Sequence, residues 1–120
     1  AERLAKALNE RDIPGVYFRP AYWTPSSGFW KDKELSGVEL VVFDPASFPP
    51  VRTAVEILCA ARVVAPQALK IDGAALDRDW GTDQLRLRLQ VGATAGAILG
   101  GWVPSRQSFE ALRKHYLLYP

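Results

Sequence analysis

Residues 37–43 carry the strongest strand signal of the chain, and this signal limits the folds that the chain can adopt. Their β-branched and aromatic side chains favour an extended conformation, and Asp44-Pro45 directly after them is typical of a turn. We expect this segment to be a central strand of a sheet. Residues 51–62 follow Pro49-Pro50, and their apolar side chains cover most of a helix circumference. This second segment is therefore expected to be a largely buried helix.

The first quarter of the chain predicts one helix and two extended pieces. Residues 2–10 place Leu4, Ala5 and Leu8 on one helical face, and Pro14-Gly15 ends that pattern. Residues 16–19 are β-branched and aromatic and should form a strand that Pro20 stops. Residues 21–25 are expected to form a second extended piece, and residues 26–36, which carry glycine and charged residues, are expected to form a loop.

Residues 85–91 give a conflicting signal. Leucine and valine alternate there with arginine and glutamine, which is the period of a strand. We predict a helix instead, because Leu, Arg and Gln favour helices over strands. Thr82 with Asp83 suits the start of this helix, and Gly92 suits its end.

The remainder of the second half is expected to contain a loop and two more helices. Residues 67–81 predict a loop with at most a short strand at residues 68–70. Thr94 can cap a short helix that ends near Gly101, and Ser105 can cap the final helix. Together these elements predict an α+β fold with a small, mostly antiparallel sheet of two to four strands packed with four to five helices.

The composition indicates one compact domain over residues 1–120 and disfavours several classes of partner. Almost half of the residues are hydrophobic, which is enough for one core. The net charge is only +2, from 15 basic and 13 acidic residues mixed along the chain, so we expect no nucleic-acid partner. No apolar run approaches the roughly 20 residues of a membrane span. One cysteine, Cys59, leaves the cellular compartment undecided.

Both ends of the chain suggest a piece of a longer protein. The first residue is not Met, and residues 2–10 already follow a helical pattern. The final helix is expected to carry Phe109, Leu112 and Tyr116 on one face, and the chain closes with an apolar tail at residues 116–119. Because termini are normally polar, we expect this tail to dock on the body of the domain or on something beyond it. We therefore interpret the chain as a C-terminal portion.

The sequence suggests no catalytic residue, metal site or cofactor. His115 falls in the last turn of the expected final helix, where the helix dipole favours a cation, and Cys59 lies in the most apolar helix. Four aspartates lie between residues 72 and 83, but their spacing does not match a calcium-binding loop. Turn formation and helix capping explain these aspartates more simply.

The most suggestive chemistry is an aromatic stretch with interleaved cations at residues 17–31. Aromatic faces stack on sugar rings, and Arg or Lys binds carboxylates or hydroxyls. Arg19, Trp30 and Lys31 are therefore candidate substrate contacts. For Phe18 and Trp23 we favour a place in the core or in a seam between domains. The simpler alternative for the whole stretch is that its aromatics fill the core and a seam between domains.

A series of short motifs along almost the whole chain resembles one bacterial family. The chain is similar to the C-terminal domain of the peptidoglycan exo-β-N-acetylmuramidases, long known as a domain of unknown function. The motifs lie in order at residues 18–20, 24–25, 37–40, 44, 48–51, 81–86, 92, 98, 102, 109, 113 and 116–119.

This resemblance implies a function for the expected longer protein. An N-terminal Rossmann-like domain would carry the catalytic carboxylate, and the C-terminal domain would pack against it as an accessory wall of the substrate cleft. The implied reaction releases N-acetylmuramic acid from the non-reducing end of peptidoglycan fragments, and the family suggests a secreted or periplasmic location. One loop departs from the family pattern, because Phe29 stands where relatives carry a lysine and Lys31 is the nearest cation.

Two alternatives to the accessory role stay open at the level of sequence. The chain could be a non-catalytic module that binds glycan or protein through the aromatic loop and the apolar tail. It could also have a purely structural role that stabilises its neighbour.

Overall fold

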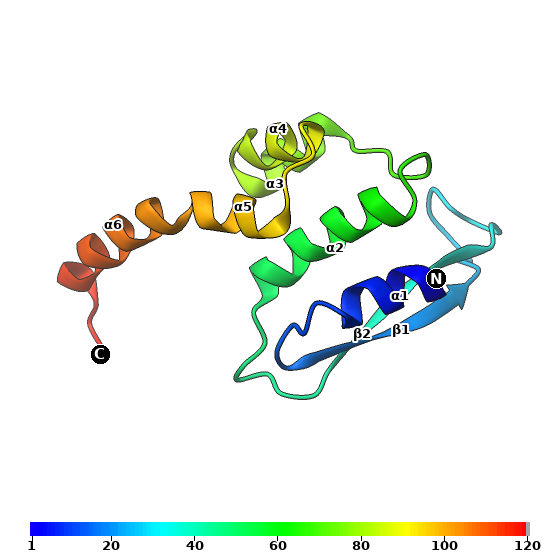
Figure 1. Cartoon of the computed structure of the whole chain (residues 1–120), viewed down its shortest axis with the longest axis horizontal. Coiled ribbons are helices and arrows are strands. Elements are labelled where there is room, and N and C mark those ends of the chain that lie inside the picture. Colours follow the sequence, from blue (N-terminus) through cyan, green and yellow to red (C-terminus); the bar gives the residue numbers. More distant parts are fainter. Residues whose placement is uncertain (120) are drawn as a thin grey trace. The chain divides into compact units, whose positions relative to one another are not determined.

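The computed structural model describes residues 1–119, which form two compact units, one up to Lys70 and one from Ile71 onward. Each unit is considered by itself. The first unit contains helix α1 (Glu2–Asn9), strands β1 (Val16–Trp23) and β2 (Leu35–Val42), and helix α2 (Pro50–Val64), as Figure 1 shows. The prediction of one domain over residues 1–120 stays a prediction.

Strands β1 and β2 form an antiparallel hairpin. Their register runs without a break from Val16 opposite Val42 to Trp23 opposite Leu35. The expectation of a central strand at residues 37–43 is wrong for the described part of the chain, because β2 pairs with β1 alone in a two-stranded sheet. The α+β class and the antiparallel sheet are confirmed.

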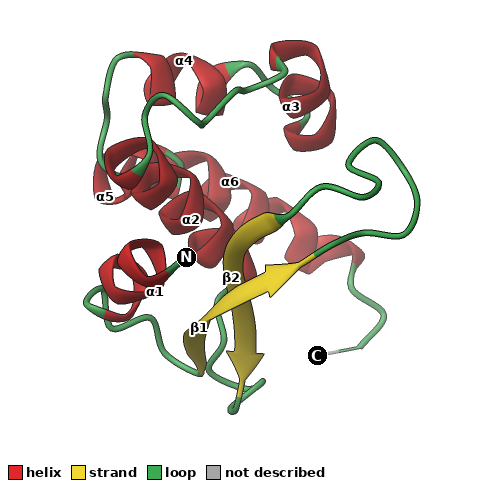
Figure 2. Cartoon of the chain, turned by 90° about the vertical axis from the view of Figure 1, so that its right-hand side faces the viewer, coloured by secondary structure: helices red, strands yellow, loops and turns green. Residues whose placement is uncertain are grey.

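The core of the first unit lies between one face of the hairpin and the two helices, which Figure 2 shows on the same side of the strands. Phe18 is at its centre and is only 1% exposed, so the prediction that Phe18 lies in the core is confirmed. The buried residues of this cluster are Ala5, Leu8, Ile13, Val16, Phe18 and Ala60. Burial of side chains of this size contributes about 1.5–3 kcal/mol for each large residue, which holds the helices on the hairpin.

Strand β1 continues through Pro20 and does not end there, which corrects the sequence-based prediction of two separate pieces. The carbonyl of Gly15 accepts from Phe43, so odd-numbered residues of this strand direct their backbone groups toward β2. Even-numbered residues direct theirs away, and Pro20 is one of them. The missing N–H therefore faces the free edge of the strand, where a proline breaks no ladder hydrogen bond.

Helix α2 begins at Pro50, as the two prolines predicted, and most of it is covered. Only Pro50, Val51 and Val63 of its fifteen residues are exposed. Its fully buried residues are Thr53, Val55, Glu56, Cys59 and Ala60. The expectation that this helix is largely buried is therefore confirmed.

The second unit is helical. Its helices are α3 (Gly73–Trp80), α4 (Gln84–Gln90), α5 (Ala95–Gly101) and α6 (Val103–Arg113), followed by the short 3₁₀ helix η1 (Lys114–Tyr116). Leu85, Leu89, Ala95 and Ile98 are its buried apolar residues. The helix predicted at residues 85–91 is confirmed, and Gly92 has the positive φ of 80° that suits a helix end. The Thr94 cap is also confirmed, because its hydroxyl accepts from the Ala97 N–H at 3.2 Å.

Two predictions for the second half are wrong. Residues 73–80, expected to be loop, form α3. Asp72 starts α3 by accepting a hydrogen bond from the Ala75 N–H at 3.1 Å. Ser105 lies inside α6 and does not cap it, because this helix already begins at Val103 with a proline in its first turn.

The end of the chain is exposed in the structure. Phe109, Leu112 and Tyr116, which were expected on one face of the final helix, are all exposed. Leu118 is 90% exposed, so it does not pack on the helices of its own unit. Docking of the tail on the body of the domain or on something beyond it stays a prediction.

Candidate functional site

Arg19 lies on the outer face of the hairpin, on the side opposite to Phe18. It stands directly across from Glu39 in the register, and its guanidinium donates to the Glu39 carboxylate at 2.6 Å from Nη2 and 3.2 Å from Nε. Both side chains are more than half exposed. Arg19 can still offer hydrogen bonds to sugar hydroxyls, but its charge is balanced within the strand pair.

Trp30 and Lys31 lie in the loop of residues 24–34 that joins the two strands. The loop is closed by its own backbone, because the Asp32 N–H donates to the Pro25 carbonyl at 2.8 Å and the Lys31 N–H donates to the Gly28 carbonyl at 3.1 Å. Trp30 is 52% exposed. The loop thus presents the indole and the lysine from a backbone that is held before any ligand arrives.

Phe29 packs edge-to-face against Trp30, with ring centroids 5.0 Å apart and an interplanar angle of 90°. Such pairs contribute about 0.5–1.5 kcal/mol beyond area burial, which helps to orient the Trp30 indole. Phe29 is itself 88% exposed. Phe29 therefore adds aromatic surface to the loop.

Trp23 is 48% exposed and so lies outside the core of this chain, while its place in a seam between domains stays a prediction. It occupies an odd position of β1 and so lies on the outer face, and its indole covers Gly37, where a Cβ would come within 3.1 Å of Trp23 Cη2. A hollow at this end of the hairpin is lined by Tyr22, Trp23, Thr24, Glu34 and Leu35. Sequence reasoning did not select Glu34, and only the pairing of the two strands reveals its place beside the tryptophan.

The three candidates are therefore not one preformed cluster. Arg19 and Trp23 share the outer face of β1, separated by four residues or roughly 13 Å along a strand. Trp30 and Lys31 lie in the loop that follows Trp23. Lys31 has a weak ion pair with Asp32 at 3.9 Å, and both side chains are exposed. The outer face and loop form one surface that an extended ligand could follow.

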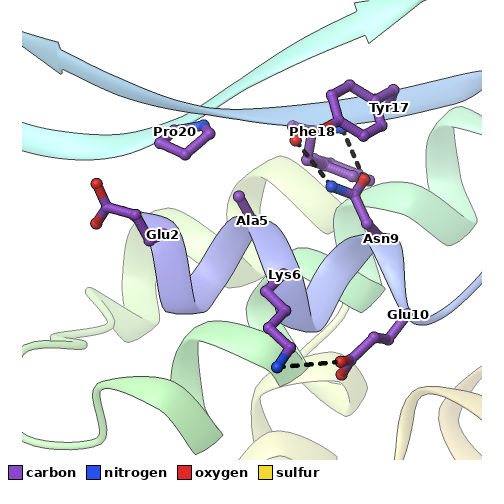
Figure 3. A pocket seen from close by; sticks show the side chains of 8 residues that line it. All are labelled: Glu2, Ala5, Lys6, Asn9, Glu10, Tyr17, Phe18 and Pro20. Atoms are coloured by element: carbon purple, nitrogen blue, oxygen red, sulfur yellow. Dashed lines mark hydrogen bonds and ion pairs between the residues drawn. The ribbon is translucent and has the colours of Figure 1, made fainter.

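A second hollow lies between α1 and the free edge of β1 (Figure 3). Its charged residues are already paired, since Lys6 and Glu10 are 3.9 Å apart and Glu2 accepts a hydrogen bond from the Tyr22 hydroxyl. That hydrogen bond lowers the pKa of the Glu2 carboxyl and raises the pKa of the Tyr22 hydroxyl. A general acid needs a raised carboxyl pKa, so Glu2 is poorly suited to that role.

Other reactive side chains are held in structural positions. Burial raises the pKa of the Cys59 thiol, which disfavours the nucleophilic thiolate. Asp72 caps α3, and Asp77 accepts from Arg86 at 2.7–3.0 Å, which ties α3 to α4. His115 lies in the exposed η1. Within residues 1–119, no three His, Cys, Asp or Glu side chains are grouped as a metal site, and no helix is long and apolar enough to cross a membrane.

Residues 1–119 match the family model described as exo-beta-N-acetylmuramidase NamZ, C-terminal. The chain belongs to this family. The resemblance seen in the sequence motifs is thereby confirmed, and with it the assignment to a family of peptidoglycan hydrolases.

Two relatives place this NamZ C-terminal domain in context. The chain is 27% identical over 117 residues to the peptidoglycan beta-N-acetylmuramidase NamZ of Bacillus subtilis strain 168, a match that covers 97% of this chain and 28% of the relative. It is also similar to the crystal structure of a DUF1343 family protein from Bacteroides fragilis NCTC 9343, with a TM-score of 0.86 and 25% identity. That match covers the whole chain and 33% of the solved one. The chain thus spans about a third or less of these relatives.

Proposed function

We propose that this chain is the C-terminal accessory domain of a peptidoglycan exo-β-N-acetylmuramidase, and that it walls the substrate cleft and contacts the saccharide without cleaving it. Its membership in the NamZ C-terminal family supports the glycoside hydrolase assignment. The catalytic carboxylate would come from an N-terminal Rossmann-like domain of the same polypeptide. The reaction would release N-acetylmuramic acid from the non-reducing end of peptidoglycan fragments.

The observation that carries the proposal is the half-exposed Trp30 beside Lys31 in a loop closed by backbone hydrogen bonds. An exposed indole leaves apolar surface in contact with water, which is unfavourable unless a ligand or partner covers it. A sugar ring has an apolar face that matches the indole in shape. The adjacent ammonium suits the carboxylate that N-acetylmuramic acid carries. Trp23 and Arg19 would extend the same surface along the outer face of the hairpin.

Kinetics of the longer polypeptide on a chromogenic muramic acid glycoside test this proposal. We expect Trp30→Ala and Lys31→Ala each to lower kcat/KM about tenfold, the loss that corresponds to 1.4 kcal/mol of binding energy. Lys33→Ala is the matched control, because Lys33 is an exposed lysine of the same loop. Equal kinetics for all three variants and the unchanged protein would refute a contact between this loop and the saccharide. The 120-residue chain alone should give no turnover.

A non-catalytic glycan- or protein-binding module is the second candidate. The exposure of the aromatic loop and of the closing residues at 116–119 favours it, because such surfaces are typical of recognition sites. Titration of muropeptides into the 120-residue chain, followed by Trp fluorescence, separates the two functions. Tight binding by the chain alone supports the module, whereas a cleft wall would bind feebly without the other half of the cleft.

A further inference from the structure

The backbone of β2 has a free edge that faces away from β1. Opposite residues of an antiparallel pair either bond to each other or both direct their backbone groups outward. Phe18 and Pro20 direct theirs outward, so their partners Leu40 and Val38 do the same on the other side of the hairpin. The outward-facing residues of this strand are Ser36, Val38, Leu40 and Val42.

The two edges of the hairpin differ in how their outward backbone groups are covered. The β1 edge is blocked at its centre, because Asn9 bonds the backbone of Phe18 and Pro20 has no N–H (Figure 3). At the β2 edge, the described residues supply neither a third strand nor a backbone hydrogen bond to the outward groups. Proteins normally cover such an edge or make it unsuitable for pairing with another strand. The open β2 edge therefore needs an explanation.

Apolar side chains accompany the open edge. Leu40 and Val42 are 40% and 39% exposed, and Phe43, directly after the strand, is 70% exposed. A strand added at this edge would satisfy the outward backbone groups and cover part of this apolar surface at the same time. A helix could cover the side chains but could not pair with the row of N–H and C=O groups.

We propose that the free edge of β2 pairs with an extended segment from another part of the same polypeptide. Most of each matched relative lies outside the region that this chain covers, so such proteins have ample chain to supply the strand. This inference rests on the proposed function only in assuming a longer polypeptide around this domain. It assigns the β2 edge as the place where this domain joins the rest of the polypeptide.

A second copy of the chain fits this edge poorly. The antiparallel register that pairs all four outward residues between two copies places Leu40 against Val38 of the other copy. Glu39 then stands opposite its own counterpart, and like charges directly across a strand pair are destabilising. Arg19 offsets this repulsion only in part, since its guanidinium is already bonded to one carboxylate.

Amide hydrogen exchange tests the proposal in the 120-residue chain and in the longer polypeptide that contains it. We expect the amides of Val38 and Leu40 to exchange about 100-fold more slowly in the longer polypeptide, because only there would they be bonded. The Phe18 amide is the internal control and should be protected in both. Equal exchange at Val38 and Leu40 in the two proteins would overturn the proposal. Protection that grows with concentration in the 120-residue chain would assign the edge to a second copy and also overturn it.

Leu40→Pro removes one outward N–H and leaves the ladder with β1 intact, as Pro20 does on the facing strand. In the longer polypeptide this variant should lose the protection at Val38, whereas the matched Leu40→Ala variant should keep it. Protection of Phe18 shows whether the hairpin remains folded, and retained protection of Val38 in a folded Leu40→Pro protein contradicts the proposal. If Leu40→Pro does not fold, the exchange of the unsubstituted proteins decides. The kinetics of the Trp30 and Lys31 variants test saccharide contact separately, so either idea can fail alone.

Discussion

The side chain of Asn9 bonds both backbone groups of Phe18, as a neighbouring strand would. The Asn9 Nδ2 donates to the Phe18 carbonyl and the Phe18 N–H donates to Asn9 Oδ1, each at 2.9 Å. The last residue of α1 thus closes the free edge of β1 at the residue whose ring is the centre of the core. One amide side chain fixes helix, strand edge and core together.

Asn9→Ala should lower the free energy of unfolding by about 2 kcal/mol, because two partly buried backbone groups lose their partners. The gain in helix propensity from alanine, about 0.5 kcal/mol, offsets part of this loss. Urea unfolding followed by circular dichroism measures the change. Asn9→Asp keeps the acceptor and loses the donor, so its free energy of unfolding should lie between those of the unsubstituted protein and the Asn9→Ala variant. A loss below about 0.5 kcal/mol for Asn9→Ala would show that water replaces the amide at this edge.

Gly15→Ala should be among the most damaging single substitutions in the first unit. Gly15 has a φ of 73°, and a Cβ there would lie 2.3 Å from the Asp44 carbonyl oxygen. We expect a loss of more than about 3 kcal/mol, because the left-handed conformation and a backbone clash both oppose alanine. Thermal unfolding measures it.

Gly28→Ala is the matched control for that substitution. Gly28 has a similar φ of 83°, but nothing lies within 4 Å of the site of a Cβ. This variant should lose only the conformational part, about 1 kcal/mol. Similar losses in the two variants would mean that the segment after β2 moves away from Gly15 at little cost.

Local signals were enough to predict part of the fold. The helix at residues 85–91 was predicted against its strand-like alternation from the helix preference of its residues and from Gly92. The Thr94 cap likewise depends on residues three positions apart. Such features are fixed within one or two turns of chain, so the sequence near them contains the information.

Non-local pairing explains what the sequence did not reveal. Pro20 was read as a strand end because the direction of its missing N–H depends on the register with β2. The exposure of Trp23 could not be predicted, because the face that it occupies depends on the same register. Helix α3 has no buried residue, and the Asp77 contact with Arg86 that ties it to α4 joins residues nine positions apart.

The candidate site was predicted only in part, because some of its contacts also depend on pairing between distant residues. The exposure of Trp30 and Lys31 follows from a loop that its composition already indicated. The partner of Arg19 could not be foreseen, because Glu39 lies twenty residues away and reaches Arg19 only through the hairpin. Glu34 was missed because a single glutamate in a loop carries no signal until Trp23 is seen beside it.

Acid should weaken the turn after β2. The Ser47 hydroxyl donates to the Asp44 carboxylate at 2.7 Å and, with the Ala46 N–H, lowers the pKa of that carboxyl. A pKa that is lower in the folded state contributes stability above the ordinary Asp value, and this stability is lost as the pH falls through the lower folded pKa. The loss should therefore occur below about pH 4.

Carboxyl NMR titration of Asp44 measures this directly. Ser47→Ala should raise the pKa of Asp44 toward the ordinary value, because the largest cause of the shift is removed. Ser47→Thr keeps the hydroxyl and should leave the pKa low. An unchanged Asp44 pKa in the alanine variant would mean that the backbone N–H groups alone lower it.

Glu56 is the buried anion of the first unit, and its removal should be costly. Its carboxylate bonds the guanidinium of Arg11 between α2 and the segment after α1, and its side chain is only 11% exposed. Glu56→Ala leaves the Arg11 cation partly buried without this partner, so we expect a loss of about 3 kcal/mol in the free energy of unfolding. Arg52→Ala is the control, because Arg52 is more exposed and lies 3.9 Å from the same carboxylate, and it should cost less than about 1 kcal/mol. Urea unfolding of both variants distinguishes the two contacts. Equal losses in the free energy of unfolding would show that the bond between Glu56 and Arg11 contributes no more than the contact between Glu56 and Arg52.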